Sequence, residues 1–204
     1  MCRKRSALMV ALLPLSLLVG GPSVVAQPPA PSGESSAAAD YFTDTVLVNQ
    51  DGEKMRFYSD LLRDKVVVIN TIFTTCTGIC PVMSKTYSRL QEHLGERVGK
   101  DVHLISISTD PENDTPERLK EFGEKFGARP GWYLLGGDRK NVESVLSKLG
   151  QYAEYKENHQ AIMLVGNVPT GLWKKAFGLA QAEKIIEIVD SVLNDEEPVT
   201  VSGQ

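Results

Sequence analysis

Two cysteines, Cys76 and Cys80, lie with three residues between them in the stretch TIFTTCTGICPVMS, and the 204-residue chain has only one other, Cys2. Two sulfurs on a short loop can form a reversible disulfide if their Cβ atoms approach to about 3.8 Å. They can also hold a soft metal ion between them. The spacing alone does not distinguish a redox-active pair or a metal site from two structural cysteines. The distinction depends on whether a further side chain lies beside the sulfurs.

Three histidines could supply a nitrogen beside these sulfurs. His159 ends the polar stretch YKENH and directly precedes the apolar run QAIMLVG. His93 falls near the end of a predicted helix, where a surface histidine is unremarkable. His103 falls in DVHLISIS, where packing or one satisfied hydrogen bond is expected. Which histidine faces the cysteines depends on the fold.

The apolar pattern predicts strands that alternate with helices. Long apolar runs are typical of strands buried on both faces, and apolar residues at helical spacing indicate amphipathic helices. Strands are expected at 65–73, 102–108 and 132–135, and hairpins around NQDGE (49–53) and NVPTG (167–171). Helices are expected after the cysteines, from Thr115-Pro116, from 142 to 149 and from 179 to 193.

This order predicts an α/β, thioredoxin-like fold, with a central mixed sheet flanked by helices and an N-terminal β-hairpin. In such a domain a cysteine pair lies at the start of a helix, where free N–H groups favour a thiolate. Pro81 is expected as the first helical residue, which makes Cys80 the predicted cap. The loop that faces the pair usually carries a proline in thioredoxins and here carries His159, the expected third ligand.

Two thiolates and one imidazole form a soft set of three ligands. Cu(I) prefers such ligands, and Cu(II) has the highest affinity among the divalent ions. Structural zinc takes four protein ligands, and no further cysteine lies outside the N-terminal segment. Met83 could add a weak thioether, although its helical spacing with Tyr87 and Leu90 predicts a core position. Copper, as Cu(I) or Cu(II), is the predicted ion.

The motifs FTTCTGICPVMS, SISTDPENDTPERLKEF and ENHQAIMLVG, in this order, resemble the Sco/SenC family from about Phe42 to Val192. Its members are membrane-facing copper proteins with a thioredoxin-like fold. They act in assembly of the dinuclear copper centre of cytochrome c oxidase, as copper donors or as reductants of its cysteine ligands. The resemblance implies that Cys76, Cys80 and His159 bind copper. It implies as partner cytochrome c oxidase subunit II or another copper or thiol protein of the envelope.

The family's acidic segment corresponds to residues 110–116 of this chain. Asp110 is expected at the sheet edge that carries the cysteines, where it either tunes the site or caps the turn into the next helix. Four positions differ from residues that are common in the family: Gly78, Asn113, Asn158 and Gln160. These differences remove charge around the site and leave all three predicted ligands in place.

Other functions use parts of the same pattern. A metal-independent thiol–disulfide oxidoreductase of the cell envelope needs only Cys76 and Cys80, and enzymatic thiol exchange therefore stays open beside a primary role as metallochaperone. A thiol peroxidase needs Thr three residues and Pro seven residues before its reactive cysteine. Neither cysteine meets both conditions, since Phe73 stands seven residues before Cys80. A plain exported binding module would leave the cysteines and His159 unexplained.

The N-terminal residues predict export. A basic start and the run SALMVALLPLSLLVG precede VVA, so 1–26 is expected to be a signal peptide cleaved before Gln27, or an uncleaved anchor. Residues 27–39 are expected to form a flexible tether, 40–195 the domain and 196–204 a disordered tail. The expected location is membrane-proximal, in the periplasm or cell envelope. A net charge of −4 without a basic face gives no sign of nucleic-acid binding.

Overall fold

The computed structural model describes residues 33–195, so the predicted signal peptide or anchor and the predicted tail lie outside the described residues. The main elements are α1 (Gly33–Phe42), β1 (Val46–Asn49), β2 (Lys54–Arg56), β3 (Val66–Ile72), α2 (Ile79–Leu94), β4 (Val102–Ser108), α3 (Pro116–Lys125), β5 (Trp132–Gly136), α4 (Arg139–Lys148), β6 (Ile162–Asn167), β7 (Leu172–Phe177) and α5 (Ala182–Leu193). A π-helix (Phe57–Leu62) and 3-10 turns at Gly95–Arg97 and Lys156–Asn158 complete them. Among the helices described, none has the length and apolar character needed to cross a membrane.

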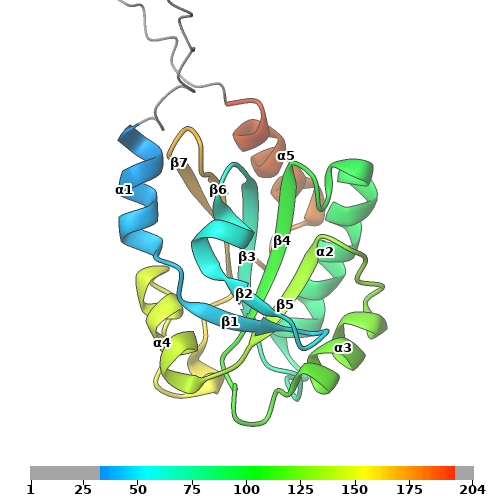
Figure 1. Ribbon diagram of the computed structural model, residues 1–204. Coiled ribbons are helices and arrows are strands. Elements are labelled where there is room, and N and C mark those ends of the chain that lie inside the picture. The colour runs from blue at the N-terminus through cyan, green and yellow to red at the C-terminus, as the bar shows by residue number, and fades with distance from the viewer. Residues whose placement is uncertain (1–32, 196–204) are drawn as a thin grey trace, which may run out of the picture. The chain divides into compact units, whose positions relative to one another are not determined.

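Within the described part of the chain, seven strands form one mixed sheet in the order β2-β1-β5-β4-β3-β6-β7 (Figure 1). The strands β3, β4 and β5 are parallel neighbours. The hairpin β6–β7 joins β3 in antiparallel orientation, and the hairpin β1–β2 joins β5 in the same way. The predicted α/β, thioredoxin-like class is confirmed, with both hairpins at the predicted places.

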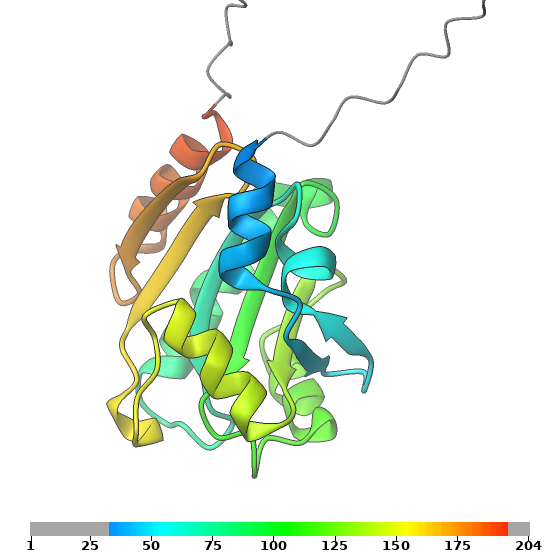
Figure 2. The same ribbon diagram turned by 60° about the vertical axis from the view of Figure 1, so that its left-hand side comes forward.

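Strand β3 lies near the middle of the sheet and is buried along its whole length. Its successive side chains point to opposite faces. Val66, Val68 and Ile72 contribute to a core with α2, α3 and α5, whereas Val67 and Ile69 contribute to a core with α1, the π-helix and α4. Figures 1 and 2 show these two groups of helices on opposite sides of the sheet. The loop that follows β3 therefore starts from a strand that is held rigidly by packing on both faces.

Helix α2 begins at Ile79, with Gly78 as its N-cap. The prediction that Pro81 starts the helix and Cys80 caps it was wrong, because both residues lie inside the first turn. Proline is tolerated there, since the first N–H groups of a helix have no intrahelical partner. Met83 is fully buried in the core, as its spacing predicts.

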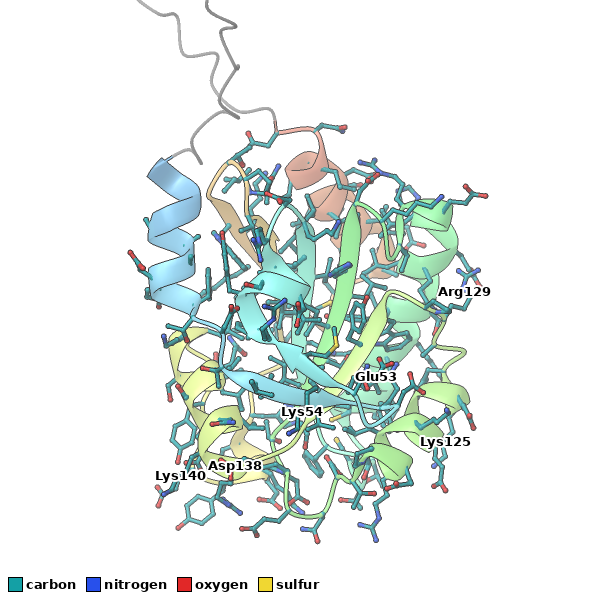
Figure 3. All side chains as sticks on the ribbon, viewed as in Figure 1. Glu53, Lys54, Lys125, Arg129, Asp138 and Lys140 are labelled. Carbon is teal, nitrogen blue, oxygen red and sulfur yellow. The ribbon has the colours of Figure 1, made fainter. Side chains whose placement is uncertain are left out.

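Helices α3 and α4 begin at capped turns that lead out of β4 and β5. Thr115 caps α3 by accepting a hydrogen bond from the Arg118 N–H, and a proline holds the first helical position, as predicted. Asp138 caps α4 by accepting hydrogen bonds from the backbone N–H groups of Lys140 and Asn141. Figure 3 labels Asp138 and Lys140 at the start of this helix. The first of these caps holds the end of the acidic segment 110–116 at the start of α3.

Helix α1 occupies part of the stretch expected to be a tether. The expectation of a flexible chain does not hold for 33–39, which belong to this ten-residue helix. Alanine is the strongest helix former, and Ala38 and Ala39 also pack against the core. The buried ring of Phe42 lies 5.5 Å from the ring of Trp173 on β7, so tertiary packing holds the helix on the sheet.

Candidate metal centre

Cys76, Cys80 and His159 come together at one end of the sheet. One ligand atom from each lies within 4.8 Å of the other two, and His159 Nε2 lies 3.5 Å from Cys80 Sγ. Zinc–sulfur bonds are about 2.3 Å long, so two sulfurs on one such ion are at most about 4.6 Å apart. The three atoms are therefore already close to the spacing that one shared ion requires. Both cysteines are free thiols.

The two sulfurs differ in solvent exposure because Cys76 lies in a loop and Cys80 lies in a helix. Cys76 is half-buried in the loop between β3 and α2, where its N–H donates to the carbonyl of Phe73 at 3.0 Å. Cys80 is fully buried in the first turn of α2. The loop itself is pinned by Thr74, whose hydroxyl donates to Asp114 at 2.6 Å and whose N–H donates to the same carboxylate at 3.2 Å.

His159 follows the 3-10 turn Lys156–Asn158 and precedes β6, which pairs directly with β3. Its Nδ1 lies 3.1 Å from the hydroxyl of Thr71 on β3. The ring of Phe73 packs against the imidazole edge to face, with centroids 5.5 Å apart. Only 6% of His159 is exposed. These contacts fix the ring with Nε2 turned toward Cys80.

The acidic segment holds both loops that carry the candidate ligands. Asp114 accepts from the cysteine loop through Thr74, as described above. Asp110 accepts from Lys156 Nζ at 2.6 Å, three residues before His159. Asp110 also accepts from the Asn113 amide at 2.9 Å and so closes its own turn. Among the contacts described, Asp110 reaches no candidate ligand directly and acts on the loop instead.

Burial sets the protonation of the site. It raises the pKa of the Cys80 thiol well above its ordinary value, and the neighbouring Cys76 adds to the effect. It lowers the pKa of His159. Burial of the Cys80 thiol therefore opposes the thiolate that is expected at the start of a helix. A thiolate is the form that binds a metal, so an incoming cation must displace the Cys80 proton.

A cavity of about 340 Å³ opens on the same site. It is lined by Phe73, Thr75, Cys76, Thr77, Gly78, Ile79, Glu157 and His159. A Cβ atom at Gly78 would meet nothing within 4 Å, so packing does not exclude the aspartate that is common there in the resembling family. The cavity makes Cys76 the sulfur that another molecule can reach, with Cys80 buried behind it.

The other two histidines lie where the sequence predicts. His93 is on the surface, with Nε2 2.9 Å from a carboxylate oxygen of Asp190. His103 is buried, and its Nδ1 lies 2.8 Å from the carbonyl oxygen of Leu61. Neither belongs to the group of potential metal ligands found among the described residues.

Two residues that contact the site, Thr71 and Lys156, were not among the residues predicted from the sequence. A hydroxyl inside the apolar run VVVINTIF was a usable signal for Thr71, because a buried polar group needs a partner. Lys156 gave no such signal, since a lysine in a polar loop is ordinary. Its position over the Phe73 ring, 5.3 Å from the centroid, depends on the folded loop.

These features define a thioredoxin-like domain in which two cysteines that follow β3 and a histidine that precedes β6 form a candidate set of soft metal ligands. The SCO1/SenC family model matches residues 33–193, and the chain belongs to the SCO1/SenC family. The SCO1 protein homolog of Bacillus subtilis is 37% identical over 103 residues, which are 49% of this chain and 51% of that protein. The chain thus matches about half the length of this relative.

Solved structures share the fold. BsSco, described as a member of the Sco family of cytochrome c oxidase assembly proteins with a disulfide switch, superposes with a TM-score of 0.60. It is 29% identical, over 72% of this chain and 90% of that one. Arabidopsis thaliana ScoI with copper bound gives a TM-score of 0.61 at 23% identity, over 72% and 94% of the two chains. At that identity the second likeness shows the fold alone.

Proposed function

We propose that this chain is a copper-binding Sco-type protein in which Cys76, Cys80 and His159 hold one copper ion. The observation that carries the proposal is the convergence of two sulfurs and one nitrogen, within 4.8 Å, from segments far apart in the sequence. Thiolate and imidazole are ligands that copper prefers. Membership of the SCO1/SenC family supports the same reading.

The proposed role is that of a metallochaperone or a thiol reductant in assembly of the copper centre of cytochrome c oxidase. The description of BsSco as a member of a family of oxidase assembly proteins supports it. The proposed partner is cytochrome c oxidase subunit II or another copper or thiol protein of the envelope. Half-buried Cys76 is the sulfur that such a partner would meet first.

The proposed location is the periplasm or cell envelope, close to the membrane. It rests on the basic start, the apolar run and VVA in the first 26 residues. N-terminal sequencing of the exported protein tests it, with a start at Gln27 as the expected result. A chain that keeps Met1 and stays in the membrane would be an anchored protein instead.

Thiol–disulfide exchange is the second candidate function, and the unequal exposure of the two sulfurs favours it. Cys76 can meet a partner's disulfide, and Cys80 lies close enough to resolve the mixed disulfide that results. The partner's disulfide would be reduced to two thiols while Cys76 and Cys80 become a disulfide. Both functions use the same sulfurs, so one chain performs them at different times.

Copper binding by the reduced protein and by His159→Ala separates the two functions. We expect one copper per chain and a Cu(II)–thiolate absorption that His159→Ala removes. Residues that merely support a ligand contribute about 10- to 100-fold in metal affinity, so loss of a ligand should cost Cu(II) at least that much. Some Cu(I) binding should persist, because two thiolates satisfy Cu(I), and disulfide exchange should be unchanged.

The exposed His93 provides the matched control, and His93→Ala should bind copper like the wild type. An unchanged Cu(II) spectrum in His159→Ala would show that His159 is not a ligand. The oxidoreductase would then be the better account of the two cysteines.

A further inference from the structure

We propose that Thr71 is a positioning residue that keeps the proton of His159 on Nδ1, so that Nε2 offers its lone pair to the ion held by the cysteines. The proposal rests on the copper site proposed above and adds to it a residue outside the three motifs that define the resemblance. Thr71 lies on β3, five positions before Cys76. It touches the imidazole and neither sulfur in the contacts described.

The two ring nitrogens of His159 have different neighbours. Nε2 lies 3.5 Å from Cys80 Sγ, whereas Nδ1 lies 3.1 Å from Thr71 Oγ1. A neutral imidazole carries one proton, and only the nitrogen without it can bind a metal. Since Nε2 is the nitrogen that faces the sulfurs, the proton has to reside on Nδ1. The Thr71 hydroxyl oxygen is placed to accept a hydrogen bond from it.

Burial increases the energetic importance of the hydrogen bond between Thr71 and His159. Thr71 is 0% exposed and His159 is 6% exposed, so water does not readily replace the hydroxyl. A buried N–H without a partner is unfavourable. Free neutral histidine in water prefers its proton on Nε2, which is the form that cannot bind the ion through that nitrogen. Thr71 therefore favours the tautomer that free histidine does not prefer.

The support behind Thr71 is rigid. Thr71 pairs with Ile107 in the parallel β3–β4 ladder, and β3 is buried between two layers of helices. A threonine is branched at Cβ, which restricts its χ1 rotation. Valine has almost the same shape but lacks the hydroxyl. Thr71→Val therefore removes the hydrogen bond and leaves the packing of β3 nearly unchanged.

The decisive experiment reads the His159 tautomer directly. Nitrogen-15 NMR of the reduced, metal-free protein should show the proton on Nδ1 in the wild type and in Thr71→Ser. In Thr71→Val the population should shift toward the proton on Nε2. Thr86→Val is the matched control, because the Thr86 hydroxyl is bonded to the Val82 carbonyl on α2 and not to His159.

Copper affinity provides the second readout, measured by competition with a chelator. Thr71→Val should weaken Cu(II) by about 10- to 100-fold, the range found for partners that orient metal-bound histidines. Cu(I) should change less, because the two thiolates suffice for it. Thr71→Ser should restore Cu(II) binding, and Thr86→Val should leave it unchanged.

Two results overturn the proposal: a wild-type protein with its proton on Nε2, or a Thr71→Val protein with unchanged tautomer and Cu(II) affinity. If Thr71→Val does not fold, Thr71→Ala, which also lacks the hydroxyl that faces His159 Nδ1, replaces it and should show the same shift of the proton toward Nε2. Failure of the copper function looks different. In that case the wild type binds no copper, while the tautomer still shifts between the wild type and Thr71→Val.

Discussion

Lys156 Nζ lies 2.6 Å from Oδ2 of Asp110, and this ion pair ties the turn before His159 to the end of β4. The pair is only partly open to solvent, with 8% of the Asp110 side chain and 30% of the Lys156 side chain exposed. Asp114, four residues later, ties down the cysteine loop in a similar way. One short acidic segment thereby fixes the distance between the sulfurs and the nitrogen.

Lys156→Met should destabilise the fold more than Asp110→Asn at pH 7. The methionine leaves a buried carboxylate with the Asn113 amide as its remaining side-chain donor, at a cost of about 1–3 kcal/mol in the free energy of unfolding. After Asp110→Asn, the partly exposed Lys156 can turn toward water. Urea unfolding of both variants measures the difference, with Lys184→Met, which breaks an exposed pair, as control.

The effect of Lys156→Met should fade in acid. Burial alone would raise the pKa of Asp110, but hydrogen bonds from Lys156 and Asn113 outweigh it and hold the pKa below its ordinary value of 3.8. A carboxyl group with a lowered pKa stabilises the fold above the unfolded value and loses that contribution as the pH falls through the folded value. A gap between wild type and Lys156→Met that persists unchanged well below pH 3.8 would contradict this account.

Asp114→Ala should weaken Cu(I) and Cu(II) by similar factors. Asp114 accepts from Thr74 in the cysteine loop and from Ser108 on β4, both at 2.6 Å, so its loss frees the segment that carries the sulfurs. In the proposed site, both Cu(I) and Cu(II) are bound through the sulfurs of Cys76 and Cys80. Lys156→Met frees the His159 loop instead and should weaken mainly Cu(II). Chelator competition with both ions checks the contrast, and an equal loss of both ions in the two variants would refute it.

His103 should make the fold less stable in mild acid. Burial lowers its pKa from the ordinary 6.5, and the charge of Lys65 acts in the same direction. Below that pH the unfolded chain binds a proton that the folded chain resists, so stability is full above 6.5 and falls as the pH drops toward the folded pKa. His103→Gln should therefore lose less stability than the wild type between about pH 7 and pH 5. Parallel stability curves would argue against the prediction.

Oxidation of Cys76 and Cys80 should form an intramolecular disulfide and abolish copper binding. A disulfide sulfur is a poor ligand compared with a thiolate, and both chemistries need the same two atoms. Copper uptake before and after reduction of the same sample measures the effect. Equal uptake by the two forms would exclude the cysteines as the essential ligands.

The sequence predicted the parts of the fold that depend on local pattern. Long apolar runs correctly predicted the strands β3 and β4, and the pair Thr115-Pro116 correctly predicted where α3 begins. The tether prediction failed at residues 33–39 because a composition typical of linkers also contains strong helix formers, and packing of Phe42 decides between them. The candidate ligands could be predicted because the order of strands brings their loops together.

Finer features of the site depend on contacts that no local pattern encodes. The partner of His159 Nδ1 is 88 positions away in the sequence, and the partner of Asp110 is 46 positions away. The burial of Cys80 likewise follows from where α2 begins on the folded sheet. The preference of proline for the first position of a helix favoured a start at Pro81, two residues later than the observed start at Ile79.

The pairing of β6 with β3 has a consequence for the order in which the molecule is assembled. The nitrogen of His159 and the sulfur of Cys80 are 79 positions apart, and synthesis produces the sulfurs first. A growing chain thus has both thiols before it has the imidazole, and the three meet only when the last hairpin docks on the central strand. In refolding experiments, the time at which the Cu(II)–thiolate absorption appears would therefore report when the β6–β7 hairpin pairs with β3.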